Sequence, residues 1–250
     1  MKKICFFLGV LTCAFPLSAQ QLYNMDFDVW SKSGGAWNLY AKDTPASRQI
    51  WDSANKGTAI LGINGTTPEY KHVAVEGKGK AAVKIASRKA FGMFVAGNLY
   101  NGSYVRTVNM SGAEMYHGVP FSGRPRSLSG YCHYLPGTID YAKAPYEHLK
   151  GKLDYGHIDI ILTDWEGPLH VDTTEGKVYN PVTDPHVIGS AVLDLREDTG
   201  GYIHFEILIN YKDARKPGYV VITAASSALG AYFTGSSKSV MYVDEFRFNY

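Results

Sequence analysis

The feature that most constrains this chain is a two-residue alternation of apolar and polar side chains. The alternation is clearest over residues 202–211, where isoleucine, phenylalanine and tyrosine at odd positions are interleaved mainly with polar residues. Such a period places one face of a β-strand against a core and the other toward solvent. After residue 19, no stretch sustains the three-to-four-residue apolar spacing of an amphipathic helix over three turns. The pattern therefore predicts an all-β fold.

The same reasoning locates further strands and their connections. Strands are expected over residues 22–30, 80–86, 91–100, 127–134, 156–163, 187–195, 202–211, 218–225 and 239–250. The strand over 91–100 is expected to end in a turn at Asn101-Gly102, because Asn-Gly is a strong turn signal. Long loops with one or two short strands are expected over 31–79, a surface loop over 164–185, and a loop or a single helical turn over 138–155. Roughly eight to ten strands with long connections predict an antiparallel β-sandwich of the jelly-roll type.

The N-terminus is typical of a secretory signal peptide. Lys2 and Lys3 precede an apolar run over residues 4–15, and Ser18-Ala19 supplies small residues at the end. The apolar run is too short to span a membrane, so cleavage is expected after Ala19, leaving no transmembrane span. Lipid attachment at Cys13 is a second interpretation, although the residues before it fit that pattern badly. The remaining residues, 20–250, are expected to form a single domain that is periplasmic, outer-membrane-surface or secreted.

Charge and cysteine content exclude several classes of partner and fold. Removal of residues 1–19 takes away two lysines and no acids, so Lys+Arg falls from 25 to 23 against 23 Asp+Glu, and the net charge becomes zero. Without a basic run, a nucleic-acid or anionic-membrane partner is not expected. Two of the three cysteines lie in the signal peptide, which leaves Cys132 alone. The fold therefore depends on its core and not on a disulfide, and Cys132 is expected to be buried and inert.

Candidate ligand-binding residues cluster around the strand over 127–134. Arg124 lies in a proline-restrained loop before this strand, and Tyr131 and His133 share the strand face opposite Cys132. A ring, an imidazole and a guanidinium fork together suit a polyhydroxylated ligand. The alternative is that Tyr131 and His133 lie on an ordinary solvent-exposed strand face, since apolar atoms make up over half of any folded surface.

Three further side chains join this candidate binding site. Glu206 lies on the polar side of the strand over 202–211, where its carboxylate could accept hydrogen bonds from sugar hydroxyls. Trp37 and Trp51 lie in the loop-rich N-terminal part, where indole rings could stack on a sugar. Packing in the core is the alternative for both tryptophans.

Asp244 is the most informative carboxylate in the sequence. It shares the parity of Tyr242, Phe246 and Phe248, which places an acid on a face expected to meet the core. A buried carboxylate needs hydrogen bonds, a charge partner or a metal. One interpretation is a structural calcium ion held by Asp244 with Asp28 or Asp26. The other is that backbone amides or a lysine satisfy Asp244 without any metal.

Catalysis would require a pair of carboxylates across a sugar-sized cleft. Asp159 and Glu206 are the best candidates, because each occupies the polar parity of a strong strand and the two could share one sheet face. Glycoside hydrolysis needs a separation of roughly 5–5.5 Å or 6.5–9.5 Å between the carboxyl groups, which sequence does not determine. A sugar-binding or simply solvated face is the alternative. Motifs for a serine nucleophile, a zinc protease, a phosphate loop or a dinucleotide are absent from the sequence.

Four pieces of the sequence, in order, resemble a known family. They are AGNLYNG at 96–102, PFSGRPRSLSGYCHYLPG at 120–137, INYKDARKPGYVVITAASSALG at 209–230, and FTGSSKSVMYVDEFRFNY at 233–250. Together they resemble the "putative carbohydrate metabolism domain" family (PCMD) of exported proteins in Gram-negative gut bacteria. The resemblance implies a jelly-roll sandwich similar to carbohydrate-binding modules. Ala231 departs from the acidic residue that the family tends to carry there, which weakens any cation or sugar contact at that position.

The residues and the resemblance lead to three hypotheses about function. The first is an exported, non-catalytic domain that binds an oligo- or polysaccharide. The second is a glycoside hydrolase or related carbohydrate-active enzyme that uses Asp159 and Glu206. The third is a structural subunit of a surface assembly. A cleft with paired acids would favour the enzyme, an aromatic groove the binding domain, and an exposed apolar patch or edge strand the subunit.

Overall fold

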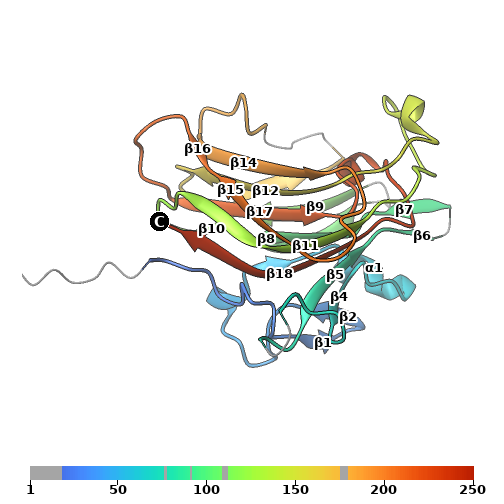
Figure 1. The fold of residues 1–250 in the computed structure, drawn as a ribbon, viewed down its shortest axis with the longest axis horizontal. Coiled ribbons are helices and arrows are strands. Elements are labelled where there is room, and N and C mark those ends of the chain that lie inside the picture. The colour runs from blue at the N-terminus through green and yellow to red at the C-terminus, as the bar shows by residue number, and fades with distance from the viewer. Residues whose placement is uncertain (1–18, 76–77, 91, 109–111, 175–179) are drawn as a thin grey trace, which may run out of the picture.

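In a computed structural model, two antiparallel β-sheets pack face to face (Figure 1). The structure describes residues 19–75, 78–90, 92–108, 112–174 and 180–250, so most of the expected signal peptide lies outside the described residues. The predicted all-β sandwich is confirmed. Helical segments are short: α1 (Asn55–Thr58), η1 (Ala46–Arg48), η2 (Ala59–Leu61), η3 (Glu147–Leu149) and η4 (Gly230–Tyr232).

The smaller sheet has five strands and carries the candidate site. Its order is β15 (Ile203–Leu208), β11 (Ser127–Leu135), β18 (Val240–Asn249), β5 (Ala82–Ala86) and β4 (Thr66–Glu69). β11 and β18 form its centre, and each was predicted as a strand to within a residue or two.

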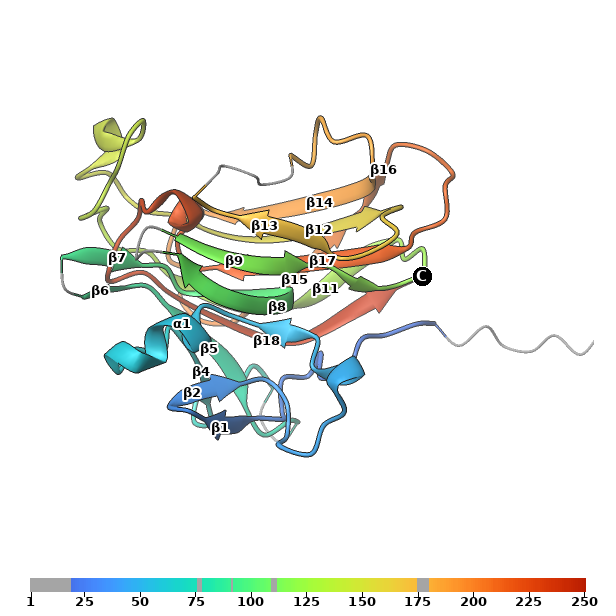
Figure 2. The same cartoon turned by 180° about the vertical axis from the view of Figure 1, so that it is seen from behind.

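The larger sheet has nine strands. Figure 2 shows the molecule from the side opposite to that in Figure 1. Its order is β13 (Leu169–Asp172), β9 (Gly112–His117), β8 (Asn98–Val108), β17 (Tyr219–Ala225), β12 (Gly156–Thr163), β14 (Val187–Leu195) and β16 (Asn210–Tyr211). Off this path, β10 (Val119–Pro120) pairs with β17, and β3 (Trp51–Asp52) pairs with β8. Two small hairpins join β1 (Ser31–Ser33) to β2 (Ala36–Asn38) and β6 (Arg88–Ala90) to β7 (Met93–Val95).

The hydrophobic core lies between the two sheets and explains the alternation in the sequence. β12 contributes Ile158, Ile160 and Leu162, all fully buried, while β11 contributes Leu128 and Cys132 from the opposite sheet. The predicted burial of Cys132 is confirmed, and this burial raises the pKa of its thiol to about 12. A thiol held in its neutral form is a poor nucleophile.

The prediction of a strand over residues 22–30 is wrong. Asn24 and Phe27 have φ of 56°, a left-handed conformation that interrupts an extended strand. The segment instead lies alongside the last part of β18, where the Phe246 N–H donates to the Met25 carbonyl at 2.8 Å. The side chain of Gln21 both donates to and accepts from the Phe248 backbone, as a neighbouring strand would.

The predicted turn at Asn101-Gly102 is also wrong, because β8 runs through it to Val108. The Asn101 amide oxygen accepts a hydrogen bond from the Ile222 N–H at 3.0 Å, so its side chain is used inside the sheet. The expected strand over 202–211 is divided between β15 and β16, which belong to different sheets. The expected loop over 164–185 contains β13. Pairing with distant segments decided each of these outcomes.

Candidate functional site

A β-bulge in β18 determines which side chains face outward beside the groove. Glu245 has φ of 51°, and the β11–β18 register shifts between Ser129 and Tyr131. Before the bulge Met241 and Val243 are buried in the core, and after it Phe246 and Phe248 are. A bulge adds one residue to a strand and so reverses its side-chain parity. Asp244 therefore lies on the outer face with Tyr242, and its predicted place on the core face is wrong.

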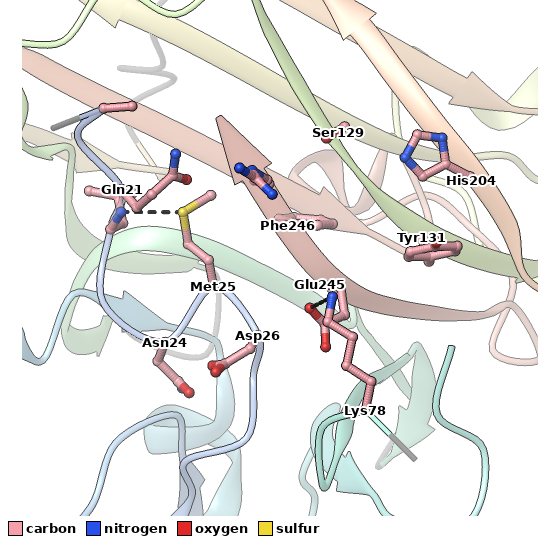
Figure 3. A pocket seen from close by; sticks show the side chains of 13 residues that line it. Gln21, Asn24, Met25, Asp26, Lys78, Ser129, Tyr131, His204, Glu245 and Phe246 are labelled. Carbon is pink, nitrogen blue, oxygen red and sulfur yellow. Dashed lines mark hydrogen bonds and ion pairs between the residues drawn. The ribbon is translucent and has the colours of Figure 1, made fainter. Parts of the chain in front are cut away.

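A groove of about 530 Å³ lies between this outer face and the N-terminal segment (Figure 3). One wall is the segment over residues 19–26, which packs beside β18. Figure 3 shows Tyr131 and His204 at the other side, with Glu245 and Lys78 below them. The lining residues are Ala19, Gln21, Leu22, Asn24, Met25, Asp26, Lys78, Ser129, Tyr131, His204, Glu245, Phe246 and Arg247.

Aromatic and polar groups meet inside the groove. The rings of Tyr131 and His204 lie 5.1 Å apart in an edge-to-face arrangement, on neighbouring strands β11 and β15. The Ser129 hydroxyl accepts a hydrogen bond from the Asn249 amide at 3.0 Å. Lys78 pairs with Glu245 at 2.8 Å, and its side chain is 63% exposed. The groove thus combines an aromatic ring with hydrogen-bond donors and acceptors, and with side chains of both positive and negative charge.

His133 lies next to this groove but is covered by the chain around residue 72. Its Nδ1 is 2.8 Å from Nε2 of His72, and its ring stacks on Tyr242 at 5.5 Å. Burial and the neighbouring His72 lower the pKa of His133. Tyr202 also holds this chain segment, through a hydrogen bond from its hydroxyl to the His72 carbonyl. The structure therefore places His133 in an aromatic cluster and leaves Tyr131 facing the groove.

Asp244 is buried, as predicted, and backbone amides satisfy it. Its two oxygens accept hydrogen bonds from the N–H groups of Ala74 and Glu245, both at 2.9 Å. Burial raises the pKa of Asp244 to about 6. Among the residues that the structure describes, no group of three or more His, Cys, Asp or Glu is arranged to hold a metal ion.

The other two acids of the calcium interpretation, Asp28 and Asp26, have different surroundings. Asp28 accepts from the N–H groups of Lys80 and Ala81, and Asp26 lines the groove. Backbone N–H groups therefore donate to Oδ1 of Asp28 and to both carboxylate oxygens of Asp244. This is the hydrogen-bonded alternative that the sequence left open.

Arg124 and Glu206 do not reach the groove. The Arg124 guanidinium donates to the carbonyls of Arg215 and Asp213, at 2.7 and 2.5 Å, and stacks on the Tyr211 ring at 3.8 Å. Glu206 accepts from the Ser127 hydroxyl at 2.5 Å and pairs with Arg126 at 3.3 Å. The Arg124 fork is thus used to hold the loop that follows β16, which the sequence could not show.

The two tryptophans, proposed either to stack on a sugar or to pack in the core, have different environments. Trp51 is 1% exposed, packs against Phe27 and donates its indole N–H to the Tyr23 carbonyl, so it is a core residue. Trp37 is half-buried in the β1–β2 hairpin, with Trp30 against its edge and Lys32 over its ring. Neither tryptophan lines the groove.

The structure does not bring Asp159 and Glu206 together. Asp159 lies on the outer face of β12, whose inner face supplies Ile158 and Ile160 to the core, and its Oδ2 is 3.7 Å from His157. Glu206 lies on the outer face of β15, whose Phe205 enters the core from the other sheet. The hydrophobic core therefore separates the two carboxylates, and the prediction that they share one sheet face is wrong.

Sequence reasoning missed most of the groove. His204 alternates with Phe205 on β15 and faces Tyr131 across the β11 pairing, so that alternation could have identified it. Lys78 and Glu245 gave no such signal, because a loop and a bulge position them. Asn24 was hidden by the expectation of a strand over 22–30, and Asp26 was considered only as a calcium ligand.

Comparison with known proteins identifies the family to which this chain belongs. Residues 26–249 match the model of the family described as "Putative carbohydrate metabolism domain", PCMD. The chain belongs to this family. The resemblance seen in the sequence is thereby confirmed, and the PCMD chain is a carbohydrate-related domain. No curated protein matches it significantly. In the described part of the chain, no helix is long and apolar enough to cross a membrane.

Two solved structures share most of the fold. A crystal structure of a "putative glycoside hydrolase" from Bacteroides thetaiotaomicron matches with a TM-score of 0.71 and 23% identity, over 90% of this chain and 70% of that one. A second, with the same description, from Bacteroides vulgatus, matches with a TM-score of 0.63 and 21% identity, over 88% and 89% of the two chains. At these identities the likeness shows the fold alone.

Proposed function

We propose that residues 20–250 of this PCMD chain form an exported glycan-binding domain, and that the groove beside β18 holds a segment of an oligo- or polysaccharide. The observation that carries the proposal is the Tyr131 ring, which lies in an open groove beside hydrogen-bonding side chains. A sugar presents a C–H face that packs on an aromatic ring and hydroxyls that both donate and accept.

The charges in the groove favour a neutral glycan. Asp26 and Glu245 supply negative charge, whereas Lys78 and Arg247 supply positive charge. Opposite charges in one groove cancel much of its field, so a strongly charged ligand gains little from it. A neutral oligosaccharide can use all four side chains as hydrogen-bond partners.

Binding without hydrolysis is the version of this function that the geometry favours. The two similar solved structures are each described as a "putative glycoside hydrolase", but the two acids that the sequence suggested for catalysis in this chain lie on opposite faces of the sandwich. Glu245 does lie in the groove, but its carboxylate is paired with Lys78. A hydrolase would need that carboxylate to donate or accept a proton at the substrate.

Export is part of the proposal and rests on the first 19 residues. The chain just after the expected cleavage site is already bound to the sandwich, because the Gln20 side chain accepts from the N–H groups of Ser122 and Gly123. Secreted or periplasmic protein should therefore begin at Gln20, which N-terminal sequencing would check. Retention of residues 1–19 in the exported protein would contradict it.

The test of binding is a glycan array followed by calorimetry on the glycan that scores highest. Tyr131→Ala should weaken binding about 5- to 30-fold, which corresponds to ~1–2 kcal/mol for a lost aromatic contact. Tyr131→Phe keeps the ring and should bind nearly as well. Arg124→Ala is the matched control, since Arg124 lies outside the groove and should leave affinity unchanged.

Two outcomes would overturn the proposal. Equal affinity of folded Tyr131→Ala and wild-type protein would remove the groove as the binding site. Release of new reducing ends from the bound glycan, abolished by Glu245→Gln, would show a hydrolase in place of a binding domain.

A further inference from the structure

A second cavity, of about 520 Å³, lies beside the ends of two strands of the larger sheet and shares no lining residue with the groove. Its walls are the segment that leaves β12, the first two residues of β13 and the residue before β14 (Figure 2). It is lined by residues 164–170 and by His186. Sites for small molecules have volumes of roughly 300–1,000 Å³, so the cavity is large enough for one sugar ring.

The Trp165 side chain supplies an aromatic wall that the fold holds in place. It packs against a small apolar cluster of Ile161, Val187 and Val221. A Cβ atom on Gly118 would lie 3.3 Å from Cζ3 of Trp165, so glycine there leaves room for the indole. Trp165 is half-buried, and part of its surface stays accessible at the cavity. A ring fixed before binding loses little freedom when a ligand stacks on it.

His186 presents a ring nitrogen to the cavity in a defined protonation state. Its Nδ1 lies 2.8 Å from Oδ1 of Asp164, and Arg215 pairs with the other oxygen of that carboxylate. Burial alone would raise the pKa of Asp164, but hydrogen bonds from His186 and Arg215 lower it, so the carboxylate is ionised. An ionised carboxylate only accepts, so Nδ1 carries the proton and Nε2 of neutral His186 is an acceptor. The His186 side chain is 61% exposed, and Nε2 has no hydrogen-bond partner among the described residues.

Glu166 supplies a second acceptor at the cavity. Its side chain is exposed and makes no hydrogen bond or ion pair with the residues that the structure describes. Asp164 pairs with Arg215, whereas no described cation pairs with Glu166. The cavity thus combines an aromatic wall with two acceptors that lack donors, one of them negatively charged.

We propose that this cavity is a second glycan-binding subsite, which takes one neutral sugar ring with its C–H face on Trp165 and its hydroxyls on Glu166 and Nε2 of His186. A sugar hydroxyl can donate to each acceptor, and the carbon face of a pyranose packs on an indole ring. An anionic sugar is disfavoured, because the charge of Glu166 would repel it. A metal ion is disfavoured as well, since the described residues hold no group of three or more potential ligands. The cavity and the groove use different residues, so either site can fail its test without the other.

The test uses protein labelled with 5-fluorotryptophan and fluorine NMR. Each of the four tryptophans gives one signal, and none of them lines the groove, so the Trp165 signal reports on the cavity. Its loss in Trp165→Phe assigns it. The probes are D-glucose, D-galactose, D-mannose, D-xylose and L-arabinose. At least one should shift the Trp165 signal, and the shift should persist in Tyr131→Ala protein.

Replacement of the free carboxylate measures its part in binding. Glu166→Ala should weaken sugar binding about 10- to 150-fold, the range for one lost hydrogen bond to a charged group. The fold should be unaffected, because Glu166 is exposed and unpaired among the described residues. Glu197→Ala is the matched control, since this exposed glutamate follows the opposite end of β14 and lies outside the cavity. It should leave sugar affinity unchanged.

Three results would overturn the proposal. The first is a Trp165 signal that none of the five sugars shifts. The second is a shift whose sugar dependence is the same in folded Glu166→Ala and His186→Ala proteins. The third uses tetramethylammonium as a further probe, because a cation also suits an indole ring beside a carboxylate. A response to this ion and to none of the sugars would show a cation site in place of a sugar subsite.

Discussion

Replacement of Gly130 by alanine tests the bulge that shapes the groove. Gly130 lies on β11 opposite the bulge, where a Cβ atom would come within 2.6 Å of Cδ1 of Phe246 and 3.1 Å of the Asp244 carbonyl. A third contact would be Cε1 of Phe205 at 3.2 Å. Gly130 does not have a positive φ, so the cost of the substitution is steric and not conformational.

The expected destabilisation follows from two opposing effects. An added methyl group in a filled core costs about 1–3 kcal/mol. Alanine also lowers the entropy of the unfolded chain relative to glycine, which returns about 0.4–1 kcal/mol. Because the 2.6 Å contact with Phe246 is far inside van der Waals distance, the upper half of the steric range, about 2–3 kcal/mol, applies. The net loss should be about 1–2.6 kcal/mol, or a fall of roughly 2–10 °C in melting temperature for a domain of this size.

Urea denaturation of residues 20–250 would measure this change in the free energy of unfolding. Gly167→Ala is the matched control, because a Cβ atom there meets nothing within 4 Å. Glycan affinity should fall in Gly130→Ala as well, since the bulge positions Glu245 beside Tyr131. A Gly130→Ala protein as stable as wild type would refute the close packing at the bulge.

Three further predictions concern the buried acid, the cysteine and the calcium interpretation. Asp244 has a pKa of about 6 against 3.8 for the free side chain, so the folded state binds its proton more tightly, and stability should fall as pH rises from about 4 to 6. Asp244→Asn should flatten that part of the profile in urea titrations, and parallel profiles would contradict the raised pKa. Cys132 should react with a thiol reagent only at the rate of unfolding, because it is fully buried; rapid native labelling would show otherwise. EDTA should leave the melting temperature unchanged, since backbone amides bind both oxygens of Asp244 and Oδ1 of Asp28; a clear drop would restore the calcium interpretation.

Local pattern predicted the parts of the fold that depend on burial alone. β11, β12, β14, β17 and β18 were each placed to within a residue or two, because a two-residue period identifies the face that meets the core. Burial of Cys132 followed from the same parity. The two-sheet class followed from the number of such segments, and the family from short pieces spread over the chain.

Local pattern failed where a distant segment competed for the backbone. Residues 22–30 alternate well, yet they pack beside β18 as an irregular segment, with Gln21 acting as a strand partner. Asn101-Gly102 is a good turn signal, but Asn101 finds a better use inside the sheet, where it binds the Ile222 N–H. A turn signal or a period describes only the residues near it, whereas the sheet is decided by pairing across the whole chain.

The sequence by itself determined that this chain forms a β-sandwich with a polar face beside Tyr131 and with a buried Cys132. Only the tertiary structure decided which polar residues work together. Asp159 and Glu206 have equal parity on strong strands, but strand order puts them on opposite outer faces. One extra residue at Glu245 moved Asp244 from the expected core face to the outer face. Parity states only that a side chain leaves the core, whereas sheet membership and register, set by long-range pairing, decide what it meets there.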